Sequence, residues 1–204
     1  MDVQLKKGVA HLKRNDPILL RIIKDHGECT LIPSKTYFQN IVRSIISQQL
    51  SVKAAATIYK RFLQNLKGKI TPAAISKLKP EEFRSAGVSG QKMRYLIDLS
   101  NFCLKNNRFF SNLENHSNQE IITELTKIKG IGEWTAQMFL IFSLNRLNVL
   151  PKADIGVKNS IKIHYNFKNH PDSKSIDKIA LNWGEYSSIA AWYLWRALDN
   201  RKKP

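Results

Sequence analysis

The chain contains 204 residues, a length that fits one large domain or two small subdomains sharing a core. Its 33 Lys and Arg face only 16 Asp and Glu, and the net charge of +17 predicts a polyanionic partner, with nucleic acid the first candidate. The 2 cysteines form no Cys-x-x-Cys motif, which excludes a disulfide scaffold and a four-cysteine metal site, and no apolar run is long enough to span a membrane.

Apolar residues recur at helical spacing along most of the chain. The pattern is clearest in residues 38–46 and 54–62, where these residues follow the i, i+3, i+4, i+7 rule. Alternation with a period of two, which is typical of strands, is nearly absent, and prolines separate the periodic segments. The sequence therefore predicts an all-α protein of about nine or ten helices.

The helices are expected to form two subdomains. We place a central helical subdomain at residues 35–150, and we expect residues 1–34 to pack with 151–204 as a second helical subdomain. Within the central subdomain, a pattern of helix, short glycine loop and helix occurs at residues 81–102 and again at residues 121–144. Only the second copy is a sharp motif, and it is the candidate helix-hairpin-helix.

The most informative segment is Leu125–Ala136, which reads LTKIKGIGEWTA. Gly130 and Gly132 allow positive φ angles and a close approach of the backbone to a phosphate. The N–H groups of Gly132 and of the following helical turn, which holds Glu133 and Thr135, would form an anion site strengthened by the helix dipole. Such a site grips the DNA backbone without reading its sequence. An ordinary turn between two helices is the alternative, because Gly-x-Gly alone is common.

The pattern L-x-x-I-x-G-I-G-x-x-T-A, followed about twenty residues later by Asp154, resembles the helix-hairpin-helix base excision DNA glycosylases. The surroundings of Asp154 and the segment Ile45–Ala56 are most similar to the 3-methyladenine DNA glycosylase II branch, in a compact form without an N-terminal β-domain. The resemblance covers about residues 35–195. It implies two helical subdomains that flank a DNA-binding and active-site cleft, base flipping, and hydrolysis of the N-glycosidic bond of alkylated purines.

By this resemblance Asp154 is the catalytic residue. A preorganised carboxylate stabilises the positive charge that develops on the sugar as the N-glycosidic bond breaks, and it can also orient or deprotonate the attacking water. An Asp shortly after Pro151 and before a helical run is equally a standard N-cap. The two roles are compatible, so both stay open.

Trp134 stands where bifunctional members of the family carry the lysine that forms a Schiff base with the sugar. Tryptophan cannot act as an amine nucleophile, so the resemblance implies a monofunctional enzyme that leaves an abasic site without cutting the strand. The ring could stack on a cationic alkylpurine, and a core tryptophan is the alternative. Lys152, two residues before Asp154, is expected to contact a phosphate, while lyase chemistry through Lys152 stays open.

Gln48, Gln49 and Leu50 lie between two helical runs. They align with the family segment that inserts a wedge through the minor groove and fills the gap left by the flipped base. The sequence does not decide which of the three side chains enters the DNA. A polar corner between helices, with Leu50 buried, is the alternative.

The C-terminal region is rich in aromatic residues. By the resemblance, Tyr186 or Trp183 lines the base pocket, whereas the spacing of Trp192 and Trp195 at i and i+3 predicts the buried face of a helix. Ile155 departs from the bacterial pattern, in which an aromatic residue often follows the aspartate. The range of accepted bases is therefore open.

We expect a DNA repair glycosylase that acts on 3-methyladenine and 7-methylguanine in double-stranded DNA, with hypoxanthine and ethenoadenine as further candidate bases. A noncatalytic helix-hairpin-helix DNA-binding module and a bifunctional glycosylase with lyase activity are the alternatives. No cofactor is required, but backbone carbonyls of the hairpin often hold a structural Na+ or K+ in this family. The matching positions are Thr126, Ile128 and Ile131.

The protein is expected to act as a monomer without a membrane partner. Its first residues lack the apolar stretch of a secretory signal peptide. We therefore expect it in the cytoplasm and nucleoid, or in the nucleus if the source is eukaryotic.

Overall fold

The computed structural model of the protein describes residues 2–199, which form thirteen α-helices and two short 3-10 helices. No strand occurs in this range, and the prediction of an all-α protein is confirmed. The helices outnumber the predicted count because three are short: α5, Pro72–Ile75, α6, Pro80–Ala86, and α8, Asn107–Ser111. None of the helices in the described range has the length and apolar character needed to cross a bilayer.

The chain divides into two compact units, Ser34–Phe139, which we call the hairpin unit, and Met1–Pro33 with Leu140–Pro204, which we call the terminal unit. The second boundary falls within a helix rather than at residue 150. One reason is that Ser188 of the terminal unit holds the connector that follows this helix. Its hydroxyl lies 2.7 Å from the Arg146 carbonyl oxygen and accepts the Val149 N–H at 3.0 Å. The cleft expected between the subdomains stays a prediction.

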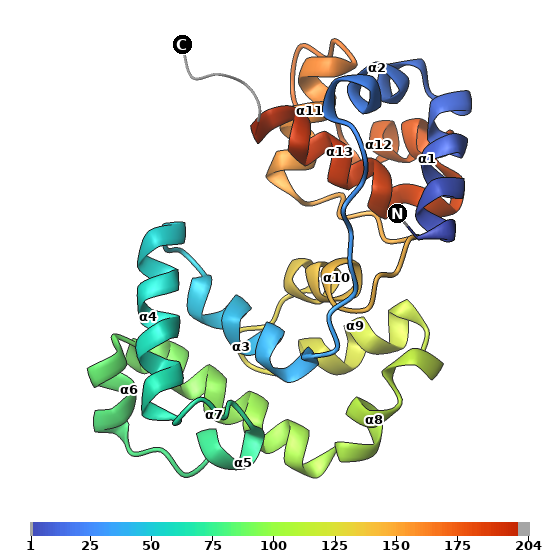
Figure 1. The fold of residues 1–204 in the computed structure, drawn as a ribbon. Helices are drawn as coiled ribbons and strands as arrows, with labels where there is room; N and C mark the ends of the chain where they lie inside the picture. The colour runs from blue at the N-terminus through green and yellow to red at the C-terminus, as the bar shows by residue number, and fades with distance from the viewer. Residues whose placement is uncertain (1, 200–204) are drawn as a thin grey trace. The chain divides into compact units, whose positions relative to one another are not determined.

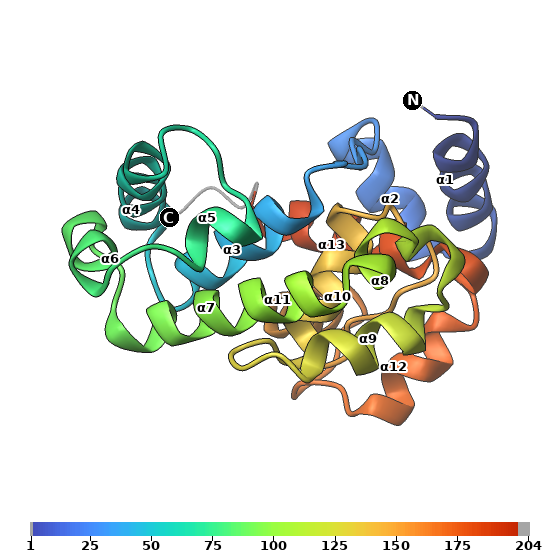
Figure 2. The same ribbon diagram turned by 90° about the horizontal axis from the view of Figure 1, so that it is seen from below.

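The hairpin unit is built around helix α3. Four apolar residues of α3 are buried: Ile41, Val42, Ile45 and Ile46. Helix α3 packs against α4 and α7, and Figure 2 shows α3 and α7 side by side. The longer helices of the unit are α3, Tyr37–Ser47, α4, Val52–Asn65, α7, Gly90–Lys105, α9, Asn118–Thr126, and most of α10, Glu133–Phe142, with a 3-10 turn at Leu113–Asn115.

The terminal unit is built around its last helix, α13, which contacts α1, α2 and α11 (Figure 1). Most residues of α13 are buried, with Tyr193 fully enclosed. The elements of this unit are α1, Val3–Asn15, α2, Pro17–His26, α11, Ile155–His164, α12, Ser173–Ala180, a 3-10 turn at Gly184–Tyr186, and α13, Ser187–Asp199.

A buried carboxylate joins the two ends of the chain in the terminal unit. Asp16 begins α2 by accepting the backbone N–H of Leu19, and its second oxygen accepts the Tyr165 hydroxyl at 2.5 Å and the Trp183 indole N–H at 2.9 Å. Burial and the Asp16 carboxylate raise the pKa of Tyr165, so its hydroxyl stays protonated as a donor. The N-terminal helices are thereby tied to the C-terminal ones.

Candidate functional site

The candidate helix-hairpin-helix joins α9 to α10. The turn between them contains two backbone hydrogen bonds, from the Ile128 N–H to the Leu125 carbonyl and from the Ile131 N–H to the Ile128 carbonyl, both 3.1 Å long. The side chains of these three residues are buried. The predicted motif is therefore confirmed, with apolar residues anchoring a short glycine turn.

The two glycines of the turn serve different purposes. Gly130 has a φ of +83°, and a Cβ there would overlap the ring of Tyr95 on α7. Gly132 is exposed, and apart from its neighbours in the chain no atom lies within 4 Å of the place where its Cβ would stand. Gly130 thus closes the turn against α7, while Gly132 leaves open space of the kind that a phosphate needs to approach the backbone.

The first turn of α10 offers backbone donors rather than side-chain donors. Glu133 is exposed and its carboxylate accepts a hydrogen bond from the Gln137 side chain at 3.0 Å. Thr135 is only 7% exposed. Because a carboxylate repels a phosphate and the Thr135 side chain is buried, only the N–H groups of this turn suit a phosphate.

The corner before α4 is fastened to the hairpin. The Gln48 side chain donates to the Gly130 carbonyl at 2.8 Å. The ammonium of Lys92, on α7, donates to the carbonyls of Ile46 and Gln48 at 2.7 and 2.8 Å, and burial lowers the pKa of Lys92. Sequence reasoning missed Lys92. The corner and the hairpin therefore hold each other in place.

Gln49 and Leu50 remain at the exposed end of this corner. Gln49 adopts a left-handed conformation with φ 57°, and its side chain is exposed. Leu50 is 39% exposed, which contradicts the alternative in which it is simply buried. Of the three candidate wedge residues, Gln48 is held by the hairpin, and Gln49 and Leu50 point to the surface.

Asp154 lies in the terminal unit and is the N-cap of α11. Its Oδ1 accepts the Val157 N–H at 2.8 Å and the indole N–H of Trp195 at 2.8 Å. The residue is 8% exposed. The predicted cap is confirmed, and the second donor fixes the orientation of the carboxylate.

The sequence pattern placed Trp195 on the buried face of a helix, and the structure shows that this prediction was wrong. It is only partly buried, whereas Trp192 is 7% exposed. The Trp195 ring stacks on Phe142 with ring centres 5.6 Å apart. A Cβ at Gly156 would lie 2.9 Å from the Trp195 ring, so the glycine after Ile155 lets the indole approach Asp154. A glycine two residues after Asp154 is therefore a sequence signal that could have indicated a bulky side chain packed close to the aspartate.

Trp183 and Tyr186, the residues predicted to line the base pocket, contact the N-terminal segment of the chain. Trp183 is fully buried and its indole donates to Asp16, so it is a core residue and its assignment to the pocket is corrected. The Tyr186 ring packs on α1, with its centre 5.2 Å from that of His11. Periodicity and family position could not reveal these contacts because the partners come from the other end of the chain.

Trp134 and Lys152 complete the predicted set. Trp134, in the first turn of α10, is 45% exposed, which contradicts its interpretation as a core tryptophan. Lys152 forms an ion pair with Asp177 at 2.8 Å. Its ammonium is therefore held by a carboxylate on α12. The hairpin, the corner and Trp134 belong to the hairpin unit, and Asp154, Lys152 and Trp195 to the terminal unit.

Comparison with known proteins gives one family. The sequence model of the HhH-GPD superfamily of base excision DNA repair proteins matches residues 42–185. A DNA-3-methyladenine glycosidase structure from Bacillus halodurans is 35% identical, with a TM-score of 0.85 over 95% of this chain and 89% of that one. A 3-methyladenine DNA glycosylase of Schizosaccharomyces pombe, solved in complex with abasic DNA, is 30% identical. Its TM-score is 0.84, and the match covers 97% of this chain and 99% of that one. A Bacillus subtilis relative is 31% identical over 89% of this chain, which spans 66% of that protein.

Proposed function

Because this chain belongs to the HhH-GPD superfamily of base excision DNA repair proteins, we propose that it is a monofunctional DNA glycosylase that releases alkylated purines from duplex DNA. The observation that carries the proposal is the Asp154 carboxylate, held by two donors beside a partly exposed pair of aromatic rings. The names of the relatives, which describe 3-methyladenine glycosylases, support the same substrate class.

Asp154 supplies the charge that the reaction needs. As the bond between the purine nitrogen and C1′ breaks, its electron pair leaves with the base and the sugar becomes cationic. A carboxylate fixed by the Val157 N–H and the Trp195 indole need not reorient to face that cation. Water then adds at C1′, and its proton passes to Asp154 or to solvent.

The aromatic residues favour cationic bases. An alkylated purine such as 3-methyladenine or 7-methylguanine is positively charged, so it gains about 0.5 to 2 kcal/mol from stacking on an aromatic face. Trp134, at 45% exposure, and Phe142, at 42%, offer such faces. The cationic base is already a good leaving group and needs no protonation, whereas hypoxanthine and ethenoadenine lack that advantage. We therefore rank these two bases lower.

The hairpin unit would hold the DNA. The backbone N–H groups at Gly132 and the start of α10 suit one phosphate, and the exposed Gln49 and Leu50 suit the gap left by the flipped base. The preceding residue, Gln48, fixes this corner through its side-chain hydrogen bond to the Gly130 carbonyl. The proposed partner is double-stranded DNA, bound by a monomer in the compartment that contains the chromosome, a nucleoid or a nucleus.

A monovalent cation at the hairpin is part of the proposal. The matching donors are the carbonyls of Thr126, Ile128 and Ile131, and α9 ends at Thr126. Carbonyl oxygens at the C-terminal end of a helix suit Na+ or K+, because the helix dipole is negative there. The ion would stiffen the turn, and no step of the reaction passes through it.

The absence of lyase activity is the first test of the mechanism. The Lys152 ammonium is paired with Asp177, and Trp134 cannot form a Schiff base. Borohydride added during turnover of lesion DNA is therefore expected to trap no covalent complex between protein and DNA. A trapped complex that disappears in Lys152→Ala would instead assign a bifunctional mechanism.

The activity itself is tested with purified protein and duplexes that each carry one defined lesion. Release of free base from 3-methyladenine and 7-methylguanine duplexes, without strand cleavage, is the expected result. Binding to these duplexes without release of any base would favour the noncatalytic DNA-binding module.

Trp195→Phe tests the bond to the catalytic carboxylate. Phenylalanine keeps a ring against Phe142 but removes the indole N–H that donates to Asp154 at 2.8 Å. A hydrogen bond to a charged group contributes about 1.5 to 3 kcal/mol, so single-turnover base release is expected to slow at least about tenfold. Trp192→Phe, on the same helix but buried, is the matched control and should keep the wild-type rate. Equal rates for all three proteins would contradict the role of Trp195.

A further inference from the structure

The first part of the hairpin unit carries an unbalanced charge. Residues 34–80 contain no Asp or Glu. Their basic residues are Lys35, Arg43, Lys53, Lys60, Arg61, Lys67, Lys69, Lys77 and Lys79. All acidic residues of this unit lie in its second part, residues 81–139. The positive charge of the first part is therefore not offset within the segment.

Helix α4 gathers part of this charge on one face. Ala55 and Phe62 are buried on the side that packs against the unit. The opposite side presents a row of exposed polar residues at intervals of three and four positions, which places them on one helix face. We call this row the α4 stripe; it consists of Lys53, Thr57, Lys60 and Gln64.

Within the part of the chain that the structure describes, the cations of the α4 stripe have no acidic partners. Among residues 2–199, Lys53 and Lys60 take part in no ion pair. The ion pairs Lys127–Glu124 and Lys152–Asp177 involve lysines in other parts of the chain. Ammonium groups without a carboxylate neighbour can neutralise phosphates without first breaking a bond within the protein.

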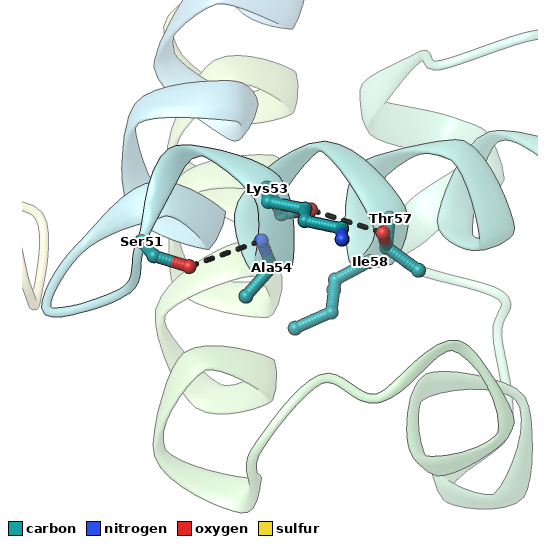
Figure 3. A pocket seen from close by; sticks show the side chains of 5 residues that line it. All are labelled: Ser51, Lys53, Ala54, Thr57 and Ile58. Atoms are coloured by element: carbon teal, nitrogen blue, oxygen red, sulfur yellow. Dashed lines mark hydrogen bonds between the residues drawn. The ribbon is translucent and has the colours of Figure 1, made fainter.

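The stripe begins directly after the exposed corner and borders a hollow. A cavity of about 400 Å³ is lined by Ser51, Lys53, Ala54, Thr57 and Ile58. Figure 3 shows the Ser51 hydroxyl accepting the N–H of Ala54 and the Thr57 hydroxyl donating to the Lys53 carbonyl, with Ile58 beside them. Lys53 and Thr57 thus belong to both the hollow and the stripe, and the helix surface leaves room beside these two side chains.

We infer that the α4 stripe binds the phosphate backbone of duplex DNA and extends the contact made at the hairpin. This inference rests on the proposed function, which identifies DNA as the polyanion. Lys53 and Lys60 are about 10 Å apart along the helix axis, which corresponds to about three base pairs of duplex. They can therefore reach separate phosphates. Contacts to phosphates carry no sequence information, so the stripe also binds undamaged DNA.

Two double variants of the full chain test this surface. Lys53→Gln with Lys60→Gln removes two charges from the stripe. The control, Lys174→Gln with Lys178→Gln, removes two exposed charges from α12, close to the carboxylate of Asp172. Binding of a fluorescent, undamaged duplex is measured between about 50 and 200 mM salt, and thermal melting by circular dichroism checks that both variants are folded.

Each phosphate contact contributes about 0.9 to the slope of log K against log salt concentration. The stripe variant should therefore show a slope smaller by about two and bind about tenfold more weakly at low salt, while the control keeps the wild-type slope. A wild-type slope in the stripe variant, or an equal loss in both variants, overturns the inference. The inference is also overturned if the stripe variant keeps the wild-type slope for DNA but no longer binds phosphatidylserine vesicles. That result would assign the stripe to a membrane surface.

The inference and the proposed function can fail separately. If the wild-type protein releases no base from any lesion duplex while the stripe variant shows the smaller slope, the glycosylase proposal falls and the DNA contact stands. If base release occurs and the wild-type protein and the stripe variant have equal slopes, the inference about the stripe is wrong and the glycosylase proposal stands.

Discussion

Asp154→Asn is expected to remove nearly all base release from a protein that stays folded. Asparagine keeps an Oδ1 acceptor for the Val157 N–H and the Trp195 indole, both at 2.8 Å, and it is as good an N-cap as aspartate. The variant loses the negative charge, which in the proposed mechanism stabilises the developing sugar cation, and its Oδ2 becomes an amide nitrogen that donates. Removal of one such preorganised group slows a reaction about 10² to 10³-fold, and single-turnover release from a 7-methylguanine duplex measures the change.

Binding to abasic-site DNA and thermal stability are the controls for this variant. Both should stay close to wild type in Asp154→Asn. Asp154→Ala removes the cap as well, so it should also lose about 1 kcal/mol of stability. Base release at the wild-type rate by Asp154→Asn would show that the residue only caps α11, and the enzymatic proposal would lose its central observation.

Gly130→Ala is expected to have the largest effect on the fold of the hairpin unit. Alanine at φ +83° is strained, and its Cβ would overlap the Tyr95 ring, whose hydroxyl is held by the Gln91 side chain at 2.5 Å. Strain and overpacking together are expected to cost about 2 to 4 kcal/mol. Chemical denaturation should detect this loss, and affinity for duplex DNA should fall with it because the turn is displaced.

Gly132→Ala is the matched variant. Apart from its neighbours in the chain, nothing lies within 4 Å of its added Cβ, so stability should change little. A methyl group at this exposed position nevertheless stands where a phosphate would approach the turn, so affinity for DNA should fall without unfolding. Equal losses of stability in both glycine variants would contradict the different purposes assigned to the two residues.

The elements that the sequence predicted well depend on near neighbours along the chain. The hairpin follows from the spacing of Leu125, Ile128 and Ile131 around two glycines, and the cap follows from Asp154 directly before a helical run. Both signals span only one or two helical turns. The same local reasoning could not find Lys92, because its partners are carbonyls 46 and 44 positions away.

The aromatic residues illustrate where local patterns fail. The family resemblance placed Trp183 or Tyr186 in the base pocket, and the spacing of Trp192 and Trp195 placed both of these on the buried face of a helix. In the fold, Trp183 reaches a buried carboxylate 167 positions away, while Trp195 donates to Asp154, 41 positions away. Which side of α13 faces Asp154 depends on how α11 packs against it.

The sequence by itself determined the helical class, the glycine hairpin, the capping aspartate and the excess of positive charge. These properties depend on residue type and on spacing within a few turns. Only the tertiary structure decided that Gln48 supports the hairpin, that Trp183 is core and that Trp195 orients the carboxylate. The reason is physical: a hydrogen bond between distant segments forms only where packing brings donor and acceptor together, and that packing is a property of the whole fold.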